Sequence, residues 1–282
     1  MTRKLIFSMI FLILGSFHLA SNNPDEKQKE NILQKMFNTI DNLSCTTYKG
    51  IIKARIDGKI QTQRGDFKVV KTPFKFYYKQ DYPQKGQEVL YVEGNNENKA
   101  IINTNSFPWV NVHLDPNCKL MRQDNHHSLY NAGFWYFNNV VKELVNSDRG
   151  VLKYDGTKSF NEKECFVYEL CHKNYQLIKY KIKEGETLQS IAKKRNINDY
   201  MIVEINKNID NLFDYKEGQE ILIPNDYAKK LILYIDANTF VPVVIYIYDH
   251  LGLYEEINYV DVEINPMLKG NEFNPNYSEY NF

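Results

Sequence analysis

Hydrophobic and polar positions alternate along this chain with two different periods. Between residues 23 and 43 apolar side chains recur every three or four positions, which predicts a helix with Ile32, Met36 and Ile40 on its core-facing side. From Cys45 to Asp115 the period shortens to two, and Gly-, Pro- and Asn-rich breaks separate short runs. This spacing predicts an antiparallel meander of strands over residues 48–56, 66–71, 74–79, 87–93, 99–103 and 109–114.

The second half of the chain shows a similar order of elements. A helix is predicted over residues 127–145, because Phe134, Phe137, Val141 and Leu144 fall on one side at helical spacing. The same tyrosine-rich alternation stands on both sides of segment 178–226, so we expect that segment to be an insertion into one larger sheet of an α+β fold. The flanking strands are predicted over residues 150–154, 164–171, 229–236, 241–248 and 254–264.

The stretch between Tyr180 and Pro224 has local signals that agree with one another. An alternating strand opens it, Thr187 can cap a first helix, and Asn198 or Asp199 can cap a second. A turn at Glu217-Gly218 precedes a last strand, which the proline ends. The predicted order is strand, helix, helix, strand.

This order resembles the lysin motif (LysM), a small carbohydrate-binding module. The matching residues are Tyr180, Ile182, Gly185, Glu186, Thr187, Leu188, Ile191, Ala192, Ile205, Asn206, Leu212, Gly218, Gln219, Ile221, Ile223 and Pro224. The family usually has Asp at the position of Glu186. The resemblance implies binding of peptidoglycan or a related N-acetylated glycan, and a packing insert without ligand is the alternative.

By the same resemblance, the sugar would lie in a shallow groove between the first strand–helix loop and the loop before the last strand. Backbone amides and carbonyls there would hydrogen-bond an acetamide group, while Leu188 and Ile209 would pack against its methyl. Such a site buries little area, so its affinity should be low. The positions implied in this sequence are Gly185, Glu186, Thr187, Leu188, Asn208, Ile209 and Asp210.

The remainder of the chain resembles an uncharacterised family of exported bacterial domains related to outer-membrane lipoprotein carriers (LolA-like). The resemblance implies an open, strongly curved antiparallel sheet, a half-barrel, with helices covering its concave side. In the carriers that apolar cavity holds acyl chains, so a lipid or lipoprotein ligand is implied here. The segments that carry the resemblance are 71–77, 85–94, 114–127 and 234–252.

The first 21 residues have the pattern of an export signal. Arg3 and Lys4 precede an apolar run over residues 5–14, and Ala20-Ser21 offers a cleavage region. This apolar run is shorter than the roughly 20 residues that a membrane-spanning helix needs. A membrane anchor is the alternative interpretation of the segment. We therefore expect a periplasmic or cell-envelope protein. Its predicted parts are a signal peptide (1–21), a discontinuous host domain (22–177 and 227–282) and a module (178–226).

Charge and cysteine content narrow the chemistry further. The formal net charge is zero, so the chain has no basic field to hold nucleic acid. An exported chain permits disulfides among Cys45, Cys118, Cys165 and Cys171. The last two are six residues apart on a predicted strand, about 20 Å, which is too far to bridge. Either bridges join distant segments or the thiols are free.

No catalytic motif of the common hydrolase, phosphate-binding or zinc-protease types occurs, so we expect no enzymatic activity and no cofactor. The best polar cluster is Asp124 with His126 and His127, which could bind a metal or move protons, or else cap the second helix. The predicted function is peptidoglycan binding through the module. The alternative is a periplasmic carrier or chaperone for a lipid or lipoprotein, held near the cell wall by the module.

Overall fold

The computed structural model describes residues 26–147 and 149–282. The predicted signal peptide and residues 23–25 of the predicted first helix lie outside the described residues. Within them, α1 runs from Glu26 to Asp41, and the side chains of Ile32, Met36 and Ile40 are buried as expected. The first predicted helix is therefore confirmed over its described length.

Eleven strands form one antiparallel sheet in the order β6-β5-β4-β3-β2-β1-β13-β12-β11-β8-β7. The strands are β1 (Cys45–Ile56), β2 (Lys59–Val70), β3 (Lys75–Tyr82), β4 (Glu88–Val92), β5 (Ala100–Asn103), β6 (Asn111–Leu114), β7 (Gly150–Phe160), β8 (Lys163–His172), β11 (Lys230–Asp236), β12 (Pro242–Asp249) and β13 (Gly252–Ile264).

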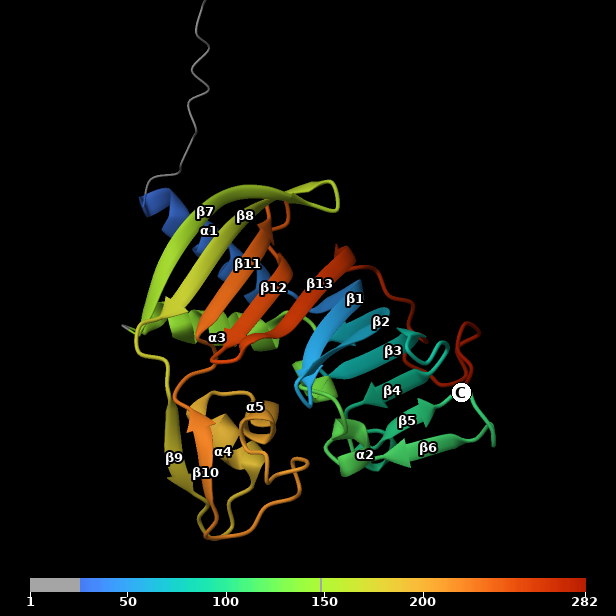
Figure 1. The fold of residues 1–282 in the computed structure, drawn as a ribbon. Coiled ribbons are helices and arrows are strands. Elements are labelled where there is room, and N and C mark those ends of the chain that lie inside the picture. The colour runs from blue at the N-terminus through green and yellow to red at the C-terminus, as the bar shows by residue number, and fades with distance from the viewer. Residues whose placement is uncertain (1–25, 148) are drawn as a thin grey trace, which may run out of the picture.

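The chain begins at the middle of this sheet and runs outward to one edge. It then continues at the opposite edge and returns to the middle. Consecutive strands β1 to β6 pair in sequence toward one edge, and the chain then crosses to β7 at the other edge. The return path ends when β13 pairs with β1, for example Ile52 opposite Ile257. The sheet curves strongly and leaves two free edges, so the predicted fold class is confirmed (Figure 1).

The crossing segment and α1 pack against one face of the sheet. It contains α2 (Lys119–Arg122), the short 3-10 turn η2 (Leu129–Asn131) and α3 (Trp135–Asn146), and α3 contacts α1. Apolar side chains of both long helices share a buried cluster with β8, β11 and β12, including Phe37, Val141, Leu170, Leu233 and Ile245. In Figure 1 these helices lie behind the β7–β13 part of the sheet.

The second predicted helix begins later than expected. Residues 127–134 form a loop around η2, and α3 starts only at Trp135. Gly133 takes a positive φ of 81°, and Ser128 and Ala132 are extended, so a continuous helix cannot pass through this stretch. Asp124 consequently caps no helix, and the prediction of a helix from residue 127 was wrong at its first two turns.

Segment 177–224 stands between the paired strands β8 and β11 and forms a second small sheet. It consists of β9 (Leu177–Lys181), α4 (Leu188–Arg195), α5 (Asp199–Ile205) and β10 (Glu220–Pro224), with β10 antiparallel to β9. The expected strand-helix-helix-strand order is present. We call residues 177–224 the inserted module.

Both predicted helix caps of the inserted module are formed. Thr187 Oγ1 accepts a hydrogen bond from the Ser190 amide, and Ser190 Oγ accepts one from the Thr187 amide, which completes a reciprocal capping box. Asn198, rather than Asp199, caps α5 by accepting from the Tyr200 amide. The module has its own buried cluster, which includes Leu188, Ile191, Ile202, Ile209 and Ile223.

The four cysteines are free thiols. Cys165 and Cys171 both lie on β8, where strand geometry keeps their sulfurs apart. Burial raises the pKa of Cys165 to about 11, so this thiol is protonated and unreactive at neutral pH. The sequence left disulfides between distant segments and free thiols as alternatives, and the structure has free thiols.

Candidate functional site

A cavity of about 470 Å³ lies on the helix-bearing face of the sheet, under the half formed by β1 to β5. Its floor follows directly from the strand period. Alternate residues of β1 point to this face, and the register places residues of β2 and β13 beside them. The apolar side chains of the floor are Tyr48, Ile52, Ala54, Phe67, Phe76, Val89, Ile102, Ile257 and Tyr259.

The roof of the cavity is the first part of the crossing segment, residues 120–133. We call this stretch the roof segment. Because the expected helix does not form there, the chain runs as an irregular strap and leaves space beneath it. Gly50 deepens the floor, since a Cβ at this position would lie 2.6 Å from the Phe67 ring. Exposed residues of the lining, such as Gln84 and Leu120, mark the mouth.

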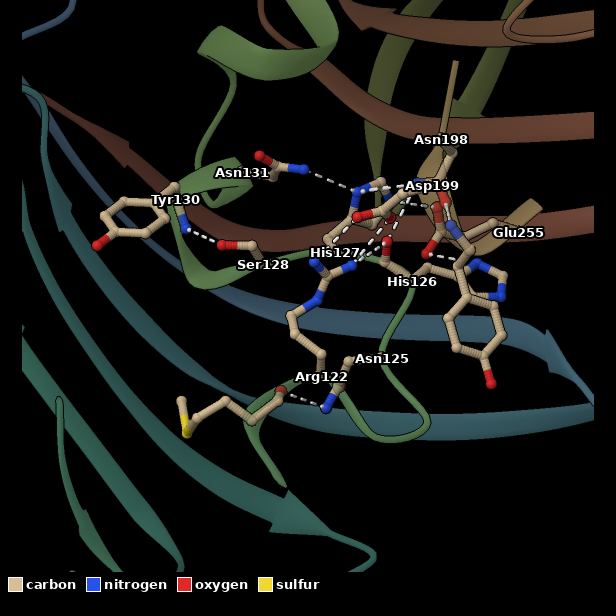
Figure 2. Close-up of polar contacts among 12 residues, drawn as sticks. Arg122, Asn125, His126, His127, Ser128, Tyr130, Asn131, Asn198, Asp199 and Glu255 are labelled. Carbon is tan, nitrogen blue, oxygen red and sulfur yellow. Dashed lines mark hydrogen bonds and ion pairs between the residues drawn. The ribbon is translucent and has the colours of Figure 1, made fainter. Parts of the chain in front are cut away.

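One end of the cavity is polar and buried. Glu255, on β13, is 1% exposed, and its Oε2 lies 2.7 Å from His127 Nε2. His126 Nδ1 approaches the other carboxylate oxygen at 3.5 Å, while its Nε2 contacts the Arg55 carbonyl at 2.9 Å. Figure 2 shows the two rings of the roof segment converging on this carboxylate.

The contacts of His126 and His127 determine the charge state of Glu255 at this end of the cavity. Asn131 Nδ2 lies 3.3 Å from His127 Nδ1, while His127 Nε2 faces the Glu255 carboxylate, an acceptor only, and so carries the proton toward it. Burial alone raises the pKa of Glu255, but the charge and hydrogen bonds of His127 and His126 outweigh it and lower the pKa to about 2. The cavity therefore ends in a carboxylate that is ionised at neutral pH.

The inserted module holds the roof segment from outside. Arg122 makes a two-pronged ion pair with Asp199 at the start of α5, with N–O distances of 2.9 and 3.0 Å. Asn198 Nδ2 donates to the His126 carbonyl at 3.1 Å, and Tyr254 donates its hydroxyl proton to Asn198 Oδ1 at 2.9 Å. The helix cap of α5 is thus also the clamp on the roof (Figure 2).

A second anchor joins the inserted module to the sheet. Arg55, at the end of β1, is 6% exposed and contacts Glu204 of α5 at 3.3 Å. It also forms a buried ion pair with Asp249 and donates to the Leu253 carbonyl at 3.0 Å. Glu204 in turn accepts from the Asp57 amide at 2.6 Å. These contacts join the module directly to the sheet.

The residues implied by the LysM resemblance divide into two groups. Gly185, Thr187, Asn208 and Asp210 are exposed and Glu186 is half-buried, with its carboxylate accepting from the Tyr180 hydroxyl at 2.7 Å. By contrast, the side chains of Leu188 and Ile209 are 0% and 3% exposed. They pack in the module core, so the expected contact of these two side chains with an acetamide methyl is not available here.

A smaller cleft of about 430 Å³ separates the last loop of the inserted module from the sheet. Asp210, Asn211 and Phe213 line it from the module side, and Asp57 and Lys119 line it from the host side. One of the implied glycan-binding positions, Asp210, therefore lines this cleft while its side chain remains exposed.

The polar cluster predicted from the sequence is only partly assembled. His126 and His127 do come together, but their partner is Glu255, and Asp124 is exposed. In the described ranges, no three His, Cys, Asp or Glu side chains are grouped closely enough to hold a metal ion. The sequence alone does not single out Glu255 and Arg55, because the same strands carry other charged residues such as Lys53 and Glu256.

Comparison with known proteins gives one family and a set of distant structural neighbours. The family model described as a protein of unknown function (DUF1571) matches residues 46–206, more than half of the chain. The match runs from β1 into α5, so it includes the part of the cavity floor formed by β1 to β5, the roof segment and the clamp, but not the residues of β13. No sequence among the curated proteins matches this chain.

Three solved structures illustrate the structural similarity. A putative outer membrane lipoprotein-sorting protein domain from Vibrio parahaemolyticus aligns at 10% identity, over 87% of this chain and 96% of that one, with a TM-score of 0.34. The lipoprotein LppX of Mycobacterium tuberculosis aligns at 9% identity over 86% and 98%, with a TM-score of 0.43. The Pseudomonas aeruginosa MucA/MucB complex aligns at 9% identity, over 87% of this chain and 60% of that one, with a TM-score of 0.42.

At this level of similarity, the function has to be inferred from this chain's own side chains. Across residues 26–147 and 149–282, no helix is both long and apolar enough to cross a bilayer.

Proposed function

Because the chain belongs to the DUF1571 family, whose description gives no activity, we propose from its geometry that it is a non-catalytic binding protein of the cell envelope for an amphiphile. The ligand would be a lipid, or the acyl chain of a lipoprotein, held in the cavity between the sheet and the roof segment. The observation that carries the proposal is this cavity of about 470 Å³ with an apolar floor. Its volume lies within the range of small-molecule sites.

The two ends of the cavity suit two parts of one ligand. An acyl chain would lie along Ile52, Phe67 and Val89, since each methylene group removed from water is worth about 0.8 kcal/mol. Glutamine side chains near the mouth, such as Gln63 and Gln84, can hydrogen-bond a polar head group. The ionised Glu255 at the buried end would repel a fatty-acid carboxylate there, which favours entry of the chain end first.

The matched pair Ile52→Trp and Ile51→Trp tests this proposal. Ile52 lines the cavity floor, whereas Ile51 is the neighbouring strand residue and points to the opposite face. We expect wild type and Ile51→Trp to bind a fluorescent C16 fatty acid, and Ile52→Trp to bind it at least tenfold more weakly. The measurement is a fluorescence titration, with native mass spectrometry to detect lipid carried through purification.

Equal binding by both variants would contradict the cavity as the site. So would a wild-type protein that takes up no acyl probe and carries no lipid. Circular dichroism of the three proteins establishes that the sheet is intact in each, so a loss specific to Ile52→Trp cannot be attributed to unfolding.

A second candidate function is glycan binding by the inserted module, which would keep the protein at the cell wall. It is supported by the LysM-type sequence and by the exposure of Gly185, Thr187, Asn208 and Asp210. The two implied loops are anchored in the same buried cluster, because each contains one of its residues, Leu188 in the first loop and Ile209 in the second. Backbone groups of these loops together with the exposed side chains of Asn208 and Asp210, rather than the two apolar side chains, would make the contacts.

Sedimentation with purified peptidoglycan sacculi tests this second function. Asn208→Ala with Asp210→Ala changes exposed positions only, while Glu217→Ala with Glu220→Ala changes exposed positions elsewhere on the module. We expect the first pair to reduce the sedimenting fraction at least fivefold and the second to leave it unchanged. Thr187 and Ile209 are unsuitable, since one caps α4 and the other is buried. Absence of wild-type sedimentation would refute glycan binding.

A further inference from the structure

The hairpin that joins β5 to β6 presents large apolar side chains to solvent. Phe107 is 84% exposed, Trp109 is 69% exposed and Val110 is 55% exposed, and all lie in the turn between the two strands. We call residues 104–110 the hairpin tip. Such a group of exposed aromatic residues at one convex turn is uncommon on soluble proteins and marks an interaction site.

The flanking sequence of the hairpin tip is free of charge. Between Lys99 and Asp115 the only titratable residue is His113, although one residue in four of the whole chain is charged. Trp and Phe are the side chains that favour the boundary between bilayer head groups and hydrocarbon. A surface that enters this boundary must carry few charges, because burying an unpaired charge there is costly.

The hairpin tip stands beside the mouth of the cavity. Asn105 Nδ2 donates to the Lys85 carbonyl at 3.1 Å, which ties the tip to the β3–β4 hairpin. The same β3–β4 hairpin contributes Pro83 and Gln84 to the cavity lining. In Figure 1 both hairpins lie at the same end of the sheet, on the right. Leu120, which is 68% exposed, borders the mouth from the roof segment.

We propose that the hairpin tip inserts into the surface of a lipid bilayer and so brings the cavity mouth against the membrane. The size of the patch favours a membrane over a protein partner. Its three side chains expose on the order of 400 Å², about half of what each partner contributes to a standard protein interface. A convex tip can enter a fluid bilayer without a complementary groove. The inference rests on exposure and position, and stands whether or not the cavity holds an acyl chain.

Trp109 provides a local reporter for the test. The chain has two tryptophans, so Trp135→Phe leaves Trp109 alone. With phosphatidylcholine vesicles we expect its emission to shift to shorter wavelength and to be quenched by brominated acyl chains. Because the tip lacks charge, adding anionic lipid or salt should change the binding less than twofold. The reciprocal variant Trp109→Phe, which reports only Trp135, should show no quenching.

The affinity for vesicles is tested by comparing two double variants, both made in the Trp135→Phe background. Phe107→Ser with Val110→Ser should weaken vesicle binding, measured by Trp109 quenching, at least tenfold. Leu251→Ser with Met267→Ser removes exposed apolar side chains away from the tip, at 61% and 99% exposure, and should leave it unchanged. Unquenched Trp109, or equal loss in both pairs, would overturn the proposal. So would a wild-type dimer that the tip variant converts to monomer, which would assign the tip to a second copy of the chain.

Discussion

Replacing Arg55 by methionine should lower the free energy of unfolding by about 3–5 kcal/mol at neutral pH, the usual cost of removing one partner from a buried ion pair. Arg55 stands between Asp249 and Glu204, both of which are nearly inaccessible. Burial lowers the pKa of Arg55, but the hydrogen bond and charge of Asp249 and the charge of Glu204 more than offset this, so the guanidinium stays charged. Methionine fills similar space but leaves two buried carboxylates without their cation.

Chemical denaturation of wild type and Arg55→Met gives the difference directly. Arg64→Met is the matched control, since Arg64 also lies in the β1–β2 hairpin but pairs with Asp81 only at 3.9 Å with both side chains about half exposed. It should cost less than about 1 kcal/mol. If the two substitutions cost the same, the buried ion pairs do not hold the inserted module against the sheet.

Glu255→Gln should remove a pH-dependent part of the stability. The folded-state pKa of Glu255 is about 2, below its ordinary value of 4.5, so the carboxylate stabilises the fold at any pH above 4.5. As pH falls from about 4.5 to about 2, protonation progressively cancels this contribution. Its size follows from the pKa difference and is about 3 kcal/mol. The gap between wild type and Glu255→Gln should therefore be larger above about pH 4.5 than at pH 2.5, and should shrink across this window.

The measurement is denaturant unfolding of both proteins at a series of pH values between 2.5 and 7, about one unit apart. Glu97→Gln serves as the control: Lys99 also lowers the pKa of Glu97, but this carboxylate is fully solvated. Its stability profile should follow that of wild type. A gap for Glu255→Gln that stays constant over the whole series would show that Glu255 acts through packing rather than charge.

The sequence predicted most strands because strand periodicity is a local property. The boundaries failed where inward positions are polar. β2 was expected from Asp66, yet it begins at Lys59, because Gln61 and Gln63 face the cavity instead of the core. Where both faces of a strand carry polar residues, the sequence shows no hydrophobic period from which the strand could be predicted. The helix expected from His127 failed for a non-local reason: His127 hydrogen-bonds Glu255 on a distant strand.

The candidate site itself could be predicted only as a consequence of the fold resemblance. Glu255 and His127 are 128 residues apart in sequence, and they meet because β13 pairs with β1 beneath the roof segment. Arg122 and Asp199 are likewise 77 residues apart. Pairings of this length depend on topology, which local patterns do not encode. The caps of the inserted module, by contrast, join residues two or three positions apart, so the sequence indicated Thr187 for the first helix and Asn198 or Asp199 for the second.

The pairing of β1 with β13 also determines when this protein can finish folding. During synthesis or export from the N-terminus, β1 to β6 can associate while one side of β1 still has unpaired backbone groups. Its partner lies about 200 residues later, so the seam closes only after nearly the whole chain has emerged. Until then an open strand edge is exposed to other chains, so we expect this interval to be the one in which the chain is most prone to aggregation.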